Sequence, residues 1–179
     1  LILYGMTTWS QIMNFEEGAA ALVIELYAQQ WNWKARYAGA DNVLGDANVR
    51  FLNDYDGLNA VGIDSSDPNG LDDIVVTQEF HLPVDRKVIF KFRSQDVLHS
   101  AYMPHFRAQM NCVPGMITEF SFTPTITTAD MRMNPDVVDK VNRINKIRYE
   151  NSQELIAKGE ESLEPYQFCL LYTSPSPRD

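Results

Sequence analysis

Cysteine and histidine are both scarce in this sequence, which has only two cysteines and three histidines in 179 residues. Two cysteines, Cys112 and Cys169, are too few for a small domain held together mainly by disulfide bonds. The sequence also has no His-Glu-x-x-His pair, no glycine-rich phosphate loop and no Gly-x-Ser-x-Gly turn. The commonest zinc-protease, nucleotide-binding and serine-hydrolase signatures are therefore absent.

Long apolar runs are also missing. The most apolar stretch is residues 1–13 (LILYGMTTWSQIM), which is shorter than the ~20 residues that a membrane-spanning helix needs. Two interpretations remain open: a short amphipathic helix packed on the domain, or the last turns of a spanning helix with Trp9 at the headgroup level.

Basic residues are outnumbered, with 15 Lys and Arg against 24 Asp and Glu and a formal net charge of -9. The segment 41–79 alone holds nine acidic residues and one basic residue, Arg50. Binding to nucleic acid needs a basic face, so we expect no nucleic-acid partner. The acidic segment is either a solvated loop or a surface that attracts a basic protein.

What remains is the composition of one globular domain, with 45% hydrophobic residues. The run 22–37 is rich in aromatic and β-branched residues and predicts a long strand or a bent pair of strands. Alternation would place Trp31 and Trp33 on one face, with at least one of them buried. The runs 73–80, 87–93, 97–103 and 117–122 predict further strands, and residues 39–70 are expected to be mostly loop. Short strands at this spacing indicate an antiparallel sandwich or barrel.

A helix is predicted over 135–158. Asn134 is a good N-cap, Pro135 suits the first helical position, and apolar residues recur at helical spacing up to Gly159. One apolar stripe cannot form a core alone, so this helix is an insertion between strands rather than a domain. We expect the following run, 164–168, to begin another strand.

Few residues can support catalysis or metal binding. His99, His105 and Cys112 offer imidazole and thiolate, which suit copper or zinc. A mononuclear blue-copper site is not favoured, because no histidine lies between Cys112 and Met116. A Cys112 nucleophile with a histidine base has no local signature in its support, and His81 and His105 are expected to be structural or exposed.

Two motifs identify a family. The run 94–104 (SQDVLHSAYMP), followed by Val113-Pro114-Gly115, closely resembles subunit II of cytochrome c oxidase, and so does the upstream run 25–33 (ELYAQQWNW). The motifs stand in the family's order, and the resemblance covers residues 1–168.

The resemblance implies a mostly β fold: a cupredoxin-like Greek-key barrel or sandwich, with the 135–158 helix inserted. It also implies a binuclear copper centre, CuA, which accepts electrons from cytochrome c and passes them to haem in subunit I. By position, His99 matches a copper ligand and Trp31 the residue through which electrons enter. Asp96, beside the copper loop, is the most favoured contributor to docking, and Asp54, Asp56, Asp72 and Asp73 are weaker candidates.

The resemblance divides the chain into three parts. Residues 1–14 would be the end of the second transmembrane helix, which places the domain on the periplasmic side of a bacterial inner membrane. Residues 20–168 would be the copper domain. The run 169–179 resembles a translated sequencing adapter and is expected to be an artefact.

The family's remaining copper ligands follow the position of Phe168, so we expect this chain by itself to be inactive and unable to assemble CuA. Two other functions stay open: a copper-free subunit II of a quinol oxidase, and a non-redox β-sandwich binding module that uses Trp31 and Trp33. The Asp-Val-Leu-His-Ser run containing His99 favours the copper-bearing branch.

Overall fold

The computed structural model describes residues 1–13, 21–53, 59–77 and 79–168. The described residues up to 125 form one compact unit, and those from 126 onward form a second.

The predicted pair of strands at 22–37 is confirmed. Strand β1 (Leu22–Gln29) pairs with β2 (Asn32–Tyr37) in antiparallel register, from Ile24 opposite Tyr37 to Gln29 opposite Asn32. The two residues between the strands form the connection, so Trp31 lies in a turn and not in a strand.

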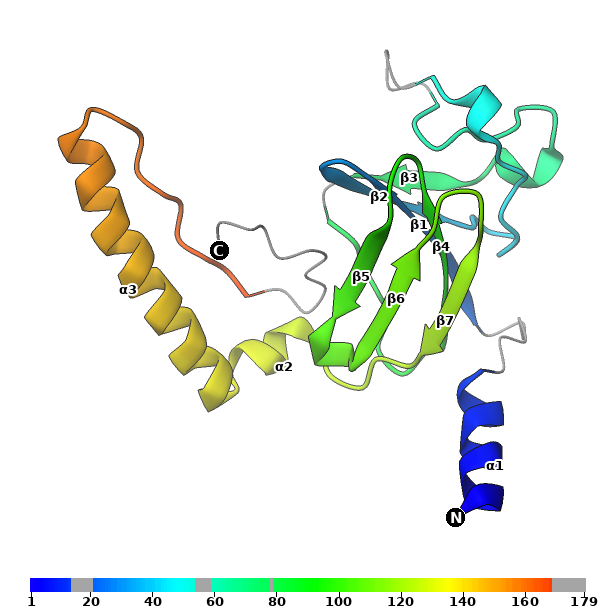
Figure 1. The fold of residues 1–179 in the computed structure, drawn as a ribbon, viewed down its shortest axis with the longest axis horizontal. Coiled ribbons are helices and arrows are strands. Elements are labelled where there is room, and N and C mark those ends of the chain that lie inside the picture. The colour runs from blue at the N-terminus through cyan, green and yellow to red at the C-terminus, as the bar shows by residue number, and fades with distance from the viewer. Residues whose placement is uncertain (14–20, 54–58, 78, 169–179) are drawn as a thin grey trace. The chain divides into compact units, whose positions relative to one another are not determined.

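The larger sheet has five strands in the order β3-β2-β1-β4-β7 (Figure 1). Its remaining members are β3 (Ile74–Val76), β4 (Val88–Ser94) and β7 (Thr118–Phe122). Strands β1 and β4 run parallel, with Leu22 opposite Val88, so the expectation of a purely antiparallel sheet is wrong. Parallel neighbours need a long crossover, and here the segment containing β2 and β3 supplies it.

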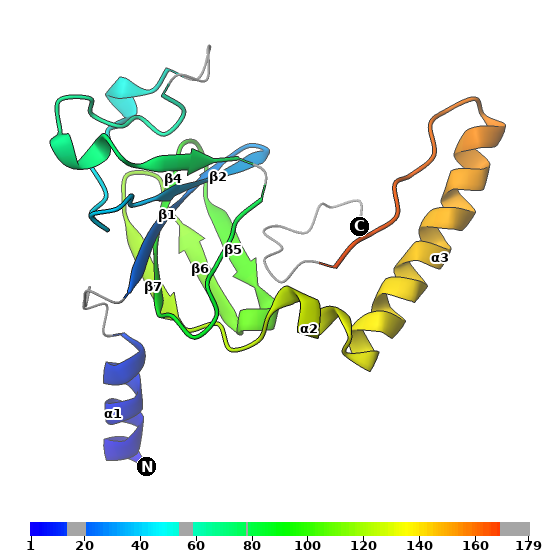
Figure 2. The same ribbon diagram turned by 180° about the vertical axis from the view of Figure 1, so that it is seen from behind.

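The second sheet consists of β5 (His99–Met103) and β6 (Ala108–Cys112). It faces the larger sheet, lying toward the viewer in Figure 1 and behind the larger sheet in Figure 2. Strand β6 was not predicted, because its residues, AQMNC, include no β-branched or aromatic side chain. The predicted strand 73–80 is also shorter than expected, since β3 ends at Val76.

The hydrophobic core lies between the two sheets. Alternate residues of β1 and β4 point into it, including Leu26, Phe90 and Phe92, which are at most 1% exposed. Ala101 and Met103 of β5 meet them from the smaller sheet. The mostly β sandwich predicted for this part of the chain is therefore confirmed.

The opposite face of the larger sheet carries buried charges beside buried apolar side chains such as Val23 and Ile89. Glu25 on β1 and Arg36 on β2 are cross-strand partners, and Arg36 also binds Asp73 and the carbonyl of Gly45. The segment after β2 is mostly loop, as expected, with short turns at Val49–Phe51 and Pro68–Gly70. Arg36 thus fastens two parts of that loop to the sheet.

The second unit contains α2 (Thr128–Arg132) and the predicted long helix, α3 (Pro135–Ala157). The Asn134 side chain accepts a hydrogen bond from the Asp136 backbone N–H, as an N-cap does, and Gly159 follows the helix with φ +80°. The expected strand at 164–168 is wrong. Residues 160–168 have no regular structure, and side chains of α3 bind their backbone groups instead.

The apolar N-terminal stretch forms helix α1 (Ile2–Ile12), none of whose residues is buried. Its large side chains are exposed, among them Trp9 at 65%. Among the described residues, no helix is both long and apolar enough to span a membrane.

Candidate functional site

The candidate site lies where β4 gives way to β5. Strand β4 ends at Ser94, whose hydroxyl donates to the carbonyl of Val97, and the Gln95 backbone N–H donates to the carbonyl of Ala28 at 2.9 Å. These bonds shape residues 95–98 into a loop, so β5 begins at His99 and not at the predicted residue 97. His99 therefore stands at the first position of a strand, with its side chain 14% exposed.

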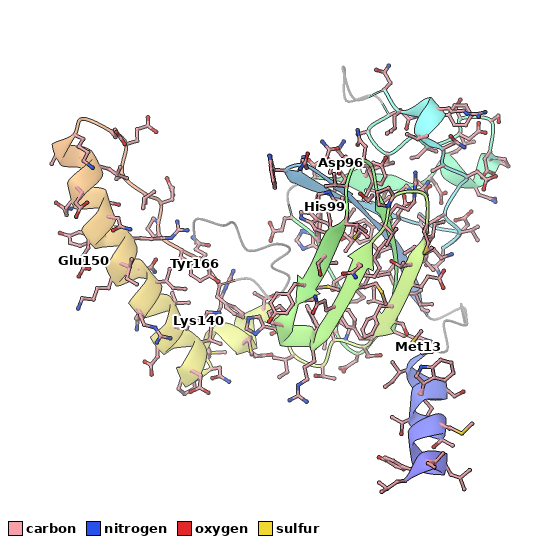
Figure 3. All side chains as sticks on the ribbon, in the orientation of Figure 1. Met13, Asp96, His99, Lys140, Glu150 and Tyr166 are labelled. Carbon is pink, nitrogen blue, oxygen red and sulfur yellow. The ribbon has the colours of Figure 1, made fainter. Side chains whose placement is uncertain are left out.

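The carboxylate of Asp96 is shared between two parts of the chain. Its Oδ1 lies 2.7 Å from Nε2 of His99 and accepts the backbone N–H of Val97 at 2.7 Å. Its Oδ2 accepts the backbone N–H of Gln30, also at 2.7 Å, from the turn between β1 and β2. Figure 3 shows Asp96 and His99 together at one end of the sandwich. One side chain thus links the β1–β2 turn to the imidazole.

The contacts of Asp96 favour its ionised form. Desolvation alone would raise the pKa of this carboxyl, but the hydrogen bond from His99 and the N–H groups of Gln30 and Val97 outweigh it and lower the pKa to about 2. A carboxylate acceptor at Nε2 places the proton on that nitrogen in the neutral imidazole. The lone pair at Nδ1 is then available to a metal ion.

The two tryptophans of the β1–β2 region differ in environment. Trp31 is 88% exposed, whereas Trp33 is partly buried against the core and meets His99 edge to face, with ring centroids 5.9 Å apart. The prediction that both lie on one face of a strand is wrong, because Trp31 precedes β2 and strand alternation does not extend to it.

Cys112 lies beside the site but is buried. It is the register partner of His99 across β5 and β6, and its side chain is fully buried in the core. Burial raises the pKa of its thiol to about 12, despite a hydrogen bond with the backbone of Ala101. A thiolate nucleophile is therefore disfavoured at neutral pH.

Of the other predicted docking residues, the two that the structure describes, Asp72 and Asp73, have partners elsewhere. Asp72 accepts the backbone N–H of Ala40 at 2.6 Å, and Asp73 binds Arg36 and Gly45. Asp54 and Asp56 lie outside the described residues, as do Cys169 and the rest of the run 169–179.

The donor set present fits one terminal ligand of a copper centre. An imidazole held by a carboxylate at one nitrogen is a common arrangement for a metal-binding histidine. In the described part of the chain, no group of three or more His, Cys, Asp or Glu side chains is placed to hold a metal ion. His99 can therefore contribute one ligand, and the described residues do not supply a full set.

Comparison with known proteins gives a match over most of the sandwich. The family described as "Cytochrome C oxidase subunit II, periplasmic domain" matches residues 22–129. The chain is 40% identical over 124 residues to the alternative cytochrome c oxidase subunit 2 of Bradyrhizobium diazoefficiens, an alignment that covers 69% of this chain and 43% of that protein. It is 36% identical over 44 residues to cytochrome c oxidase subunit 2 of Thermostichus vulcanus, covering 25% and 14% of the two chains. The chain thus spans less than half the length of these relatives.

Two solved structures are also similar. One is the periplasmic domain of subunit II of cytochrome oxidase of Bradyrhizobium japonicum, with 23% identity, a TM-score of 0.37 and coverage of 59% of this chain and 65% of that chain. The other is a mixed disulfide intermediate between a thioredoxin-like protein and subunit II of cytochrome c oxidase, with 22% identity, a TM-score of 0.38 and coverage of 59% and 62%.

Proposed function

Because the chain belongs to the family of the periplasmic domain of cytochrome c oxidase subunit II, we propose that it is the electron-transfer subunit of a respiratory cytochrome c oxidase. In this role it accepts electrons from cytochrome c and passes them to subunit I, where haem is held. The observation that carries the proposal is the Asp96–His99 hydrogen bond of 2.7 Å at the end of the sandwich that also exposes Trp31.

His99 is the proposed terminal ligand of the copper centre. When bound, copper supplies a one-electron carrier. The protein's part is to present Nδ1 of the imidazole, and Asp96 does this by holding the proton at Nε2. The further ligands of a CuA centre follow the position of Phe168 in the family that the sequence resembles. Residues 1–168 by themselves are therefore expected to bind copper only weakly and without the CuA spectrum.

Trp31 is the proposed site where electrons enter. Its indole is 88% exposed on a turn, so a partner can contact it without moving the sheet. The backbone of this turn is held in place, because the N–H of Gln30 donates a hydrogen bond to Asp96. A negative charge at Asp96 would also attract the basic face of a donor protein, in keeping with the docking role predicted for it.

The domain is proposed to lie on the periplasmic side of a bacterial inner membrane, with residues 1–14 as the end of a membrane anchor. Support comes from the family's description as periplasmic and from the exposed apolar side chains of α1. Leu3 is 80% exposed and Trp9 is 65% exposed, which suits lipid or another apolar surface better than water.

The experiment is electron transfer in the oxidase that contains this subunit, with Trp31→Leu compared with Tyr102→Leu. Tyr102 is also exposed, at 45%, and lies on β5, so both variants remove an exposed aromatic ring. We expect Trp31→Leu to abolish oxygen uptake driven by cytochrome c and Tyr102→Leu to leave it unchanged. Equal activities in the two variants would refute the proposed role of Trp31.

A further inference from the structure

The strongest unexplained feature is the way one carboxylate joins two segments that are distant in sequence. Asp96 and Gln30 are 66 residues apart, yet Asp96 Oδ2 accepts the Gln30 N–H at 2.7 Å. The other oxygen, Oδ1, meets His99 Nε2 at the same distance. Gln30 directly precedes Trp31 in the chain, so this carboxylate connects the backbone next to the exposed indole with the imidazole.

We propose that Asp96 is a positioning residue that joins the Trp31 turn to His99, and that electronic coupling between the indole and the imidazole runs through its carboxylate. The inference rests on the proposed function for the direction of electron flow. It goes beyond docking, because it assigns Asp96 a role within the bound complex rather than in its formation.

The path consists of bonds and two short hydrogen bonds. It runs from Trp31 through its backbone nitrogen to the carbonyl carbon, Cα and nitrogen of Gln30, and across that N–H to Oδ2. It continues through the carboxylate carbon to Oδ1 and across to Nε2 of His99. One electron passes from a reduced one-electron carrier protein, which is oxidised, to the one-electron metal acceptor that His99 would help to hold in the oxidase, which is reduced. No bond is broken, the proton stays on Nε2, and neither Asp96 nor Trp31 changes its oxidation state, since both serve only as the bridge.

A second path through Trp33 is available and is less direct. It follows the chain from Trp31 through Asn32 to the Trp33 indole and then crosses a ring contact to His99, with centroids 5.9 Å apart. No hydrogen bond spans that contact in the described structure, and coupling across a non-bonded gap falls more steeply with distance than coupling along bonds. The Asp96 path is therefore the stronger one.

The first test is nuclear magnetic resonance on this chain, without metal or donor. Scalar couplings across hydrogen bonds report shared electron density, so the Gln30 amide nitrogen and His99 Nε2 should both couple to the side-chain carboxyl carbon of Asp96. In Asp96→Asn the amide has only one acceptor oxygen, so at most one of the two couplings can remain. Asp139→Asn, which makes the same charge change on α3, should keep both. Absence of the His99 coupling in the unmodified chain would overturn the proposal.

The second test separates bridging from docking. A ruthenium-labelled donor cytochrome is bound to the oxidase, and a light pulse reduces its haem. The first-order rate of electron transfer within the complex is then measured separately from the dissociation constant. We expect Asp96→Asn to lower the first-order rate severalfold, and Trp33→Phe and Asp139→Asn to leave it close to that of the unmodified oxidase. If Asp96→Asn changes only the dissociation constant and its salt dependence, Asp96 is a docking charge and the bridge is wrong.

The two proposals fail in different ways. If the unmodified oxidase takes no electrons from the donor, the proposed function is wrong, while the couplings between Gln30, Asp96 and His99 still decide whether the bridge exists. If the donor reaction is normal and the couplings are absent, the bridge alone is wrong.

Discussion

Arg36 and Glu25 form an ion pair within the larger sheet, with Nε and Oε2 2.8 Å apart and both side chains 3% exposed. The pair does not stand alone. The other oxygen of Glu25 accepts from Arg93, and the other end of Arg36 binds Asp73 and Gly45. Buried charges are tolerated when each is paired and hydrogen-bonded. Each charge of this network, which joins three strands and a loop, has such a partner, although Oδ1 of Asp73 has none among the described residues.

Removing Arg36 should destabilise the sandwich strongly. In Arg36→Leu, Glu25 loses one partner and Asp73 remains buried without its cation, and breaking a buried pair in this way costs about 3–5 kcal/mol. Urea unfolding followed by circular dichroism measures the loss. Arg50→Leu is the control, because Arg50 is exposed and such changes usually stay within about 0.5 kcal/mol. Similar losses in the two variants would show that the network contributes little.

The two tryptophans should contribute very differently to the stability of the fold. Trp33→Ala removes a ring packed against the core and against His99, and we expect it to lower the free energy of unfolding by about 2 kcal/mol, less than for a fully buried ring. Trp31→Ala should change it by no more than about 0.5 kcal/mol, because the indole is exposed. Chemical denaturation of both variants checks the order, and a larger loss for Trp31 would contradict the environment described for the turn.

Tyr37 makes stability fall at high pH. Burial raises the pKa of its phenol above 10.0, although the hydrogen bond that it accepts from the His81 backbone N–H acts in the opposite direction. A pKa that is higher in the folded state means that the unfolded state loses its proton first. The stabilisation is therefore complete below pH 10.0 and is lost as the pH rises through the pKa of the folded state.

The matched variant for this effect is Tyr37→Phe. It should be less stable than the unmodified chain at neutral pH, since it lacks both hydrogen bonds, and the difference should shrink above pH 10.0. Urea midpoints measured across that range test it. A constant difference would mean that Tyr37 ionises alike in the folded and unfolded states.

Helix α3 should hold the segment after it through Asn145. The Asn145 side chain accepts the backbone N–H of Tyr166 at 2.7 Å and donates to the carbonyl of the same residue at 3.3 Å. Asn145→Ala removes both bonds. We expect it to lower the free energy of local opening of residues 163–168 by about 2 kcal/mol while leaving the helix intact. Hydrogen exchange at the Leu163 and Tyr166 amides measures this. Asn142→Ala is the control, because Asn142 is exposed on the same helix. Equal exchange in both variants would show that the two Asn145 hydrogen bonds do not hold this segment.

Helix α3 could be predicted from short-range sequence patterns alone. Its N-cap at Asn134, its apolar spacing and its end before Gly159 were all predictable, because each depends on residues within a few positions of one another. The run 22–37 was likewise predicted to be strand, but its division by a turn at 30–31 was only one of two alternatives. Strand β6 carried no such signal, and it forms because it completes a sheet with β5 and covers the core.

The sequence by itself identified the family motifs, the mostly β composition, the helix α3 and His99, Trp31 and Asp96 as the residues of interest. Only the tertiary structure decided that β1 and β4 run parallel, that Trp31 is exposed while Trp33 packs against His99, and that Asp96 binds both Gln30 and His99. The reason is physical. Propensity, capping and alternation act between near neighbours in the chain, whereas strand order, burial and the partners of a carboxylate depend on which distant segments the fold brings into contact.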